Sequence, residues 1–173
     1  MNLNNNLRIA LDLDDTVFGF YEAYNKKFPG QTTERAITKN VFKLRHNKEF
    51  WENLPLLEKP NFEPAIYATK RINPKSYTRN CLLKHGLPIK PIYQMVLQQG
   101  NKADMIKGSC DVLIDDSISN VNKAIKSGLP ALLIDRPHNQ NGDPVFRIYS
   151  LDIEEIKEAY KLELETLGWN LKK

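Results

Sequence analysis

Short apolar runs alternate along the chain with longer stretches in which apolar residues recur at helical spacing. Five runs have the length of buried strands, and they lie at 7–13, 64–69, 91–96, 111–115 and 130–134. The last two are almost continuously apolar, as strands covered on both faces require. The pattern therefore predicts an α/β fold in which a five-stranded parallel sheet lies between layers of helices.

Clear C-terminal ends mark three of the intervening helices. Helical sequence at 76–85, 119–127 and 153–167 is followed in each case by a glycine, a residue that commonly ends a helix. A proline stands two residues after the first two of these glycines. These ends are the best-defined element boundaries in the sequence.

The segment 17–63, between the first two predicted strands, interrupts this alternation. Its 47 residues exceed what one crossover helix with short loops needs, and they include nine of the sixteen aromatic residues. No repeat, low-complexity tract or interdomain linker divides the rest of the chain. We therefore expect a single domain over residues 1–173, in which 17–63 forms a small helical cap over one end of the sheet.

Composition narrows the class of protein. The chain is 41% hydrophobic and 27% charged, as is ordinary for a globular domain, and its short apolar runs predict no membrane partner. Cys81 and Cys110 have no nearby partner in the sequence, so we expect reduced thiols in a cytoplasmic protein.

The three histidines, His46, His85 and His138, lack metal-ligand spacing, so we expect no zinc site. The net charge of +4 favours an anionic substrate, although a solvated basic surface explains it equally well.

Acidic residues stand where two of the predicted strands end. Asp12 and Asp14 stand at the end of the first apolar run, and Asp115 and Asp116 stand at the end of the fourth. In an open parallel sheet, ligands bind beyond the carboxyl ends of the strands, so these acids converge if the two strands are neighbours. Four carboxylates in one cleft repel one another unless some are protonated or a cation lies among them. Ligand sets made only of oxygen favour Mg²⁺.

A calcium loop and simple solvation of strand ends are the alternatives to a magnesium site. An EF-hand loop at 12–16 is excluded, because Val17 stands where that loop needs glycine and because a strand precedes it. Acidic residues that are simply exposed to solvent at a strand end would account for one pair of acids. Two pairs on separate strands make solvation the less favoured alternative.

Four motifs in sequence order resemble those of the haloacid dehalogenase-like phosphohydrolases. The first, DxDx[TV], corresponds to 12–16, and the second, an apolar strand ending in Ser or Thr, ends here at Thr69. The third is a lysine before the fourth strand, for which Lys102 fits and Lys107 is a weaker candidate. The fourth is the acidic pair 115–116. The resemblance implies a Rossmann-like three-layer sandwich and phosphoryl-transfer chemistry.

Within that superfamily the chain looks most like the 5'(3')-deoxyribonucleotidase group. The stretches 20–29, 50–55 and 112–116 carry the resemblance. Asp15 replaces the usual glycine of the group, the cap is shorter, and the helix expected between Pro60 and the second strand is almost absent. These departures concern the identity of the substrate more than the type of reaction.

The resemblance assigns a role to each acid, and elementary chemistry agrees with these roles. Asp12 would attack phosphorus to form an aspartyl-phosphate, while Asp14 would protonate the leaving oxygen and later activate water. Magnesium would bind Asp12, the backbone carbonyl of Asp14 and Asp116. Asp115 would ligate the ion through water or orient its ligands.

Basic and hydroxyl groups complete the expected site. Thr69 and Lys102 would hold the phosphoryl oxygens, although a helix cap and a surface lysine are the ordinary alternatives. Lys70 and Arg71 either add positive potential or face water. Asn120 is interpreted only as a residue at a helix start.

The aromatic cap favours a small enclosed substrate, so a nucleoside monophosphate is the first choice. Phe20 would stack on the nucleobase, and 50–51 would supply the opposite wall. Two alternatives stay open: a 3'-phosphatase acting on nucleic-acid ends, and a catalytically silent binding protein of the same fold. The chain has no P-loop or dinucleotide motif, and Asp14 argues against dehalogenation because a leaving halide needs no proton.

Overall fold

A six-stranded parallel sheet forms the centre of the molecule. The computed structural model describes residues 7–95, 100–141 and 146–169. In these ranges the strands follow the order β3-β2-β1-β4-β5-β6, and every neighbouring pair is parallel. The strands are β1 (Ile9–Leu11), β2 (Ile66–Thr69), β3 (Ile92–Gln94), β4 (Val112–Asp115), β5 (Ala131–Ile134) and β6 (Arg147–Ile148).

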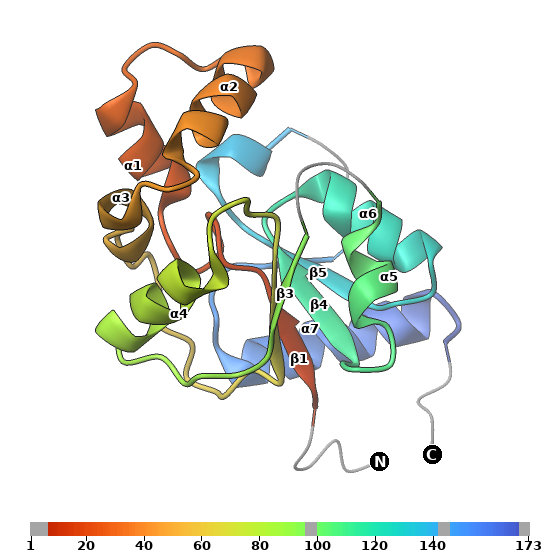
Figure 1. Cartoon of the computed structure of the whole chain (residues 1–173). Helices are drawn as coiled ribbons and strands as arrows, with labels where there is room; N and C mark the ends of the chain where they lie inside the picture. The colour runs from red at the N-terminus through yellow and green to blue at the C-terminus, as the bar shows by residue number, and fades with distance from the viewer. Residues whose placement is uncertain (1–6, 96–99, 142–145, 170–173) are drawn as a thin grey trace.

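Helices cover both faces of this sheet (Figure 1). The apolar side chains of α4 and α7 pack against one face, and those of α5 and α6 pack against the other. The α-helices are α1 (Phe20–Lys27), α2 (Glu34–Leu44), α3 (Lys48–Glu52), α4 (Lys75–Lys84), α5 (Lys102–Ile106), α6 (Ile118–Lys126) and α7 (Ile153–Thr166). The predicted three-layer α/β sandwich is thus confirmed.

The prediction of five strands is wrong by one. All five predicted runs contain a strand, but β6 adds a sixth at the edge of the sheet. It was missed because it is only two residues long and begins with the charged Arg147. Val96, predicted as the last residue of the third strand, lies outside the described residues.

The predicted helix ends agree with the structure to within one residue. The glycines that follow α4, α6 and α7 have φ angles of 63°, 79° and 65°, in the left-handed region that other residues seldom adopt. These positive φ values let the chain leave each helix in a tight turn.

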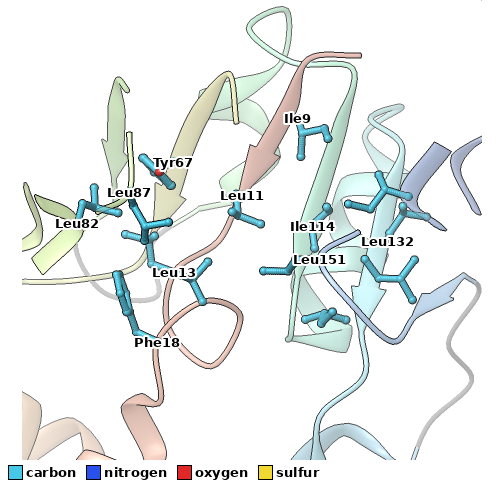
Figure 2. Close-up of a cluster of buried hydrophobic side chains, with 14 of the residues drawn as sticks. Ile9, Leu11, Leu13, Phe18, Tyr67, Leu82, Leu87, Ile114, Leu132 and Leu151 are labelled. Atoms are coloured by element: carbon cyan, nitrogen blue, oxygen red, sulfur yellow. The ribbon is translucent and has the colours of Figure 1, made fainter. Parts of the chain in front are cut away.

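Strict alternation along β1 divides the core into two parts. Ile9 and Leu11 point into the cluster shared with α4 and α7, whereas Ala10 points into the cluster shared with α5 and α6. Figure 2 draws Leu11 and Ile114 of the first cluster on neighbouring strands. Because both faces are covered, β1, β2, β4 and β5 are buried along their length, as the apolar runs predicted, whereas β3 at the sheet edge is half-buried.

The segment between β1 and β2 contains the helices α1, α2 and α3, which lie together at the upper left of Figure 1. Phe18 and Trp51 from this segment are buried in the same cluster as the side chains of β1 and α4. The segment is therefore anchored to the sheet by apolar contacts. Among the described helices, none combines the length and the apolar character that crossing a membrane requires.

Candidate active site

The strand register brings the predicted acids together. β1 lies between β2 and β4, with Leu11 opposite Ile114, and the backbone N–H of Asp12 donates to the carbonyl of Ile114 at 2.9 Å. Asp12, Asp115 and Asp116 each offer one carboxylate oxygen, and these oxygens all lie within 4.8 Å of one another. This is the point where strand order reverses, which is the usual ligand position in such sheets. The buried triad could hold a metal ion.

Lys102 lies directly against two of these acids. Its ammonium donates to Oδ1 of Asp12 and, at 2.6 Å, to Oδ2 of Asp115, and the side chain is only 2% exposed. Burial raises the pKa of Asp12 well above its ordinary value; the charge of Lys102 opposes this effect, and the neighbouring carboxylates add to it. Lys107, the weaker candidate, instead donates to the carbonyl of Ser127 at 2.6 Å and is not part of the site.

The other two acids have different partners. Asp115 is fully buried, and its oxygens accept hydrogen bonds from the backbone N–H of Ser117 at 2.9 Å and from the Asn120 amide at 3.0 and 3.2 Å. Oδ2 of Asp116 lies 2.7 Å from Nε2 of His138. Burial raises the pKa of Asp116 although the hydrogen bond to His138 opposes it, and the same hydrogen bond raises the pKa of His138. Asp115 is thus tied to protein donors, while Asp116 lies toward the surface.

Asp14 is held by a buried arginine. Arg71 donates from Nε to Oδ2 of Asp14 at 2.9 Å and from a terminal nitrogen to Oδ1 at 2.7 Å, so the pair is bidentate. Thr69 also contacts Oδ2 at 3.4 Å. Arg71 is 1% exposed, so the alternative in which it faces water is wrong. The helix-cap alternative for Thr69 is wrong as well, because the next helix has Pro74 at its N-cap.

Asp15 shows how this chain departs from the group it resembles. Its φ angle is 57°, in the left-handed region that favours glycine, at the position where the resemblance expects glycine. Aspartate tolerates this region better than most residues. Its carboxylate accepts from the backbone N–H of Tyr21 at 3.0 Å, and its carbonyl accepts from Arg136 at 2.8 Å. Burial raises the pKa of Asp15 to about 7.

A pocket of about 450 Å³ lies between this acidic edge and the cap. Its lining combines charged residues of the sheet edge with aromatic, aliphatic and hydroxyl residues of the cap. The lining residues are Asp12, Asp14, Asp15, Phe20, Tyr21, Thr32, Glu34, Ile37, Thr38, Val41, Trp51, Lys70, Lys102, Asp116 and Asn120. A flat apolar group would match the cap end, whereas the acidic end, with four carboxylates and two lysines, would accept an anionic group only together with a cation.

The aromatic residues of the cap differ in part from the prediction. Phe20 lines the pocket, but its ring also stacks on Trp51, with centroids 5.9 Å apart and planes at 18°. The two rings therefore belong to one wall, and the prediction that 50–51 supplies the opposite wall is wrong. Phe50 packs edge-on against Phe20 at 6.1 Å.

Three contributors were missed or undervalued in the sequence. Asn120 lies within α6, and its side chain bonds both Asp115 and, at 2.6 Å, the ammonium of Lys70, so it is more than a helix-start residue. His138 lies in the short 3-10 helix η1 (Pro137–Asn139) after β5, Arg136 is its N-cap residue, and neither carried a motif. The one available signal was their place after a strand, since such loops surround the ligand position.

Comparison with known proteins adds nothing to the assignment. Neither the models of protein families nor the curated proteins give a significant match to this chain. The site therefore has to be interpreted from its own geometry.

Proposed function

We propose that the protein is a metal-dependent phosphomonoester hydrolase of the haloacid dehalogenase-like type. The observation that carries this proposal is the position of Asp12, which lines the pocket, bonds Lys102 and lies close to two further acids. A phosphomonoester dianion is a poor electrophile, so its hydrolysis needs charge neutralisation, an in-line nucleophile and a proton for the leaving oxygen. The residues of this pocket can supply all three.

The donor set fits Mg²⁺ as the metal. Three carboxylate oxygens within 4.8 Å form a hard, oxygen-only set of the kind that Mg²⁺ prefers. Asp12 and Asp116 would hold the ion together with the backbone carbonyl of Asp14, and Asp115, bonded to Ser117 and Asn120, would orient the set. Bound there, the ion would neutralise charge on the phosphoryl group.

The two half-reactions use one pair of carboxylates. Asp12 attacks phosphorus, and the ester P–O bond breaks as Asp14 gives its proton to the leaving oxygen. The resulting aspartyl-phosphate is hydrolysed by a water whose proton returns to Asp14. Lys102, which lines the pocket, would hold a phosphoryl oxygen through both steps. Thr69, predicted for the same role, is buried, is not among the lining residues and contacts Asp14 instead.

A nucleoside monophosphate is the substrate that this pocket favours. The volume of about 450 Å³ suits a small molecule, and Phe20, which lines the pocket while stacking on Trp51 and Tyr24, would offer an aromatic contact to a base. The end of a nucleic-acid strand would need an open, basic groove instead. Of the pocket-lining residues that α2 contributes, Ile37 and Val41 are apolar, Thr38 is neutral and Glu34 is acidic, so this wall is not basic.

We also propose a cytoplasmic location, which rests on the two cysteines. Cys81 and Cys110 are buried free thiols. Unpaired cysteines are typical of proteins from a reducing compartment.

The test is phosphate release from a panel of substrates, with Mg²⁺ or with chelator. The panel contains nucleoside monophosphates, sugar phosphates and 3'-phosphorylated oligonucleotides. We expect the fastest release from a nucleoside monophosphate, and only with Mg²⁺. Preference for the oligonucleotides would replace the substrate assignment, and binding without any release would support the silent binding protein and overturn the proposal.

A further inference from the structure

Arg71 is a buried cation at the edge of the site, and its guanidinium forms hydrogen bonds with two side chains. Two of its nitrogens hold the carboxylate of Asp14, and a third donates to the hydroxyl of Thr78 in α4 at 3.2 Å. Although burial opposes it, the pKa of Arg71 is raised, because the charge of Asp14 and the bonds to it outweigh the loss of water. Removing either partner of such a buried pair would leave an uncompensated charge inside the protein.

The main chain at Arg71 is fixed from a neighbouring strand. The side-chain amide of Gln94, in β3, donates to the carbonyls of Arg71 at 2.9 Å and of Asn73 at 2.6 Å. The turn after β2 is therefore tied to β3 at two points. Because this turn is held in place, the guanidinium of Arg71 keeps a fixed position and restricts the movement of Asp14, its partner.

The guanidinium also contacts the cap. It lies 5.3 Å from the ring centroid of Trp51 and 5.9 Å from that of Phe18. The indole N–H of Trp51 donates to the carbonyl of Leu44 at 2.8 Å, and its ring stacks on Phe20. Arg71 thus connects the carboxylate of Asp14 to the aromatic wall of the pocket.

We propose that Arg71 is the positioning residue for Asp14 and that it acts only through the two proton transfers of that carboxyl group, donation to the leaving oxygen and later uptake from water. This inference rests on the proposed function. A bidentate guanidinium fixes both the rotamer and the plane of a carboxylate, which a single hydrogen bond cannot do. Asp14 then meets the leaving oxygen in one orientation, while Asp12 forms its bond to phosphorus without help from Arg71.

The proposal makes the importance of Arg71 depend on the substrate. When the ester P–O bond breaks, a basic alkoxide needs the proton of Asp14 as it leaves. A 4-nitrophenolate is stable as an anion and leaves without one. Loss of Arg71 should therefore damage hydrolysis of an alkyl phosphate far more than hydrolysis of 4-nitrophenyl phosphate.

The experiment measures kcat/KM of the full chain with Mg²⁺, because this constant reports the steps up to the first bond cleavage. The substrates are thymidine 5'-monophosphate, phenyl phosphate and 4-nitrophenyl phosphate, and the variant is Arg71→Gln. General acid catalysis contributes about 10²- to 10⁴-fold, so we expect a loss of about 10²-fold or more for the nucleotide. The loss should be smaller for phenyl phosphate and less than about tenfold for 4-nitrophenyl phosphate.

Two further variants test whether the loss caused by Arg71→Gln acts through Asp14. In an Asp14→Asn background, Arg71→Gln should cause no further loss, because the proton it helps to deliver is already absent. Arg79→Gln is the matched control: Arg79 is exposed on α4, and all three rates should stay at the wild-type level.

Equal losses on all three substrates, or a further loss in the Asp14→Asn background, would overturn the proposal. If Arg71→Gln does not fold, Arg71→Lys keeps the charge without the bidentate geometry and must reproduce the graded losses. A wild-type chain that hydrolyses none of the three substrates would instead refute the proposed function, so the two failures are distinguishable.

Discussion

The two ends of the neighbouring strands β1 and β4 carry ion pairs of opposite character. At the amino end, Arg8 and Asp111 pair at 2.7 Å with side chains 50% and 31% exposed. At the carboxyl end, Lys102 pairs with Asp12 and Asp115, and all three side chains are almost inaccessible. The first pair joins one acid to one base in water, whereas the second site buries more acids than bases.

The exposed and the buried ion pairs differ in what they contribute to the stability of the fold. An exposed pair contributes about 0 to 1 kcal/mol and costs little to form. A buried excess of negative charge weakens the fold unless a cation or a ligand compensates it. Clusters of this kind gather where chemistry needs them, so the carboxyl end is where we expect the reaction.

The largest expected effect is that of Asp12→Asn, compared with Asp111→Asn at the opposite strand end. The amide keeps the shape of the side chain but loses nucleophilicity and ligand charge, so we expect kcat to fall by about 10⁴-fold or more. Because burial raises the pKa of Asp12, removing its charge should also raise the melting temperature without metal. Steady-state kinetics and thermal melts measure both effects.

Asp111→Asn should leave kcat unchanged, since it loses only the exposed pair with Arg8. If Asp12→Asn kept a rate within tenfold of wild type, a different nucleophile would have to be sought.

Removal of the metal should reduce phosphate release to background. Asp12, Asp115 and Asp116 repel one another less with a divalent cation among them, so Mg²⁺ should also raise the melting temperature of the wild type. Differential scanning fluorimetry with EDTA and with added Mg²⁺ tests this, with Asp12→Asn as the variant that should respond less. Full activity in excess chelator would contradict the proposed mechanism.

Phe20→Ala tests the cap side of the pocket. Stacking on a base is worth about 1 to 3 kcal/mol, so KM for a nucleoside monophosphate should rise roughly 5- to 100-fold or more. KM for a small aryl phosphate should change much less. Phe42→Ala, at a 56% exposed position of α2, is the control and should alter neither. Equal changes on both substrates would mean that Phe20 supports the ring cluster and does not bind a base.

Glu163→Gln tests a buried acid at the amino end of β5, away from the reaction. Oε1 of Glu163 accepts from the backbone N–H of Ala131 at 2.9 Å, and among the described residues Oε2 has no hydrogen-bond partner. Burial raises the pKa of Glu163 to about 8 from an ordinary value of 4.5. Between these values the folded chain binds a proton that the unfolded chain has lost, so stability should fall as pH rises from about 4.5 to about 8.

In Glu163→Gln this pH dependence should disappear, and the variant should be about 1 to 3 kcal/mol more stable than wild type at pH 9. Urea unfolding at pH 6 and pH 9 measures the difference. Glu158→Gln, an exposed change on the same helix, should behave as wild type. An identical pH dependence in Glu163→Gln and wild type would contradict the assignment.

Position along the chain was enough to predict most of the acidic site. The acids at 12 and 115 stand at the carboxyl ends of buried strands, and parallel strands bring these ends to one edge, so convergence required only that the two strands be neighbours. Lys102 was predicted from the family resemblance, which places a lysine before the fourth strand. The direct hydrogen bonds of Lys102 to Asp12 and Asp115 could not be predicted, because the rotamer of a long side chain depends on packing.

The amino-acid sequence by itself determined the layered α/β fold, the helix ends and the edge of the sheet where the acids gather, because these follow from apolar periodicity and local backbone preference. Tertiary structure alone decided that Arg71 is buried against Asp14, that Asn120 and His138 reach the acids, and that Phe20 and Trp51 form one wall. Those contacts join residues from separate elements. Their partners are set by how helices and loops pack on the sheet, which no local pattern encodes.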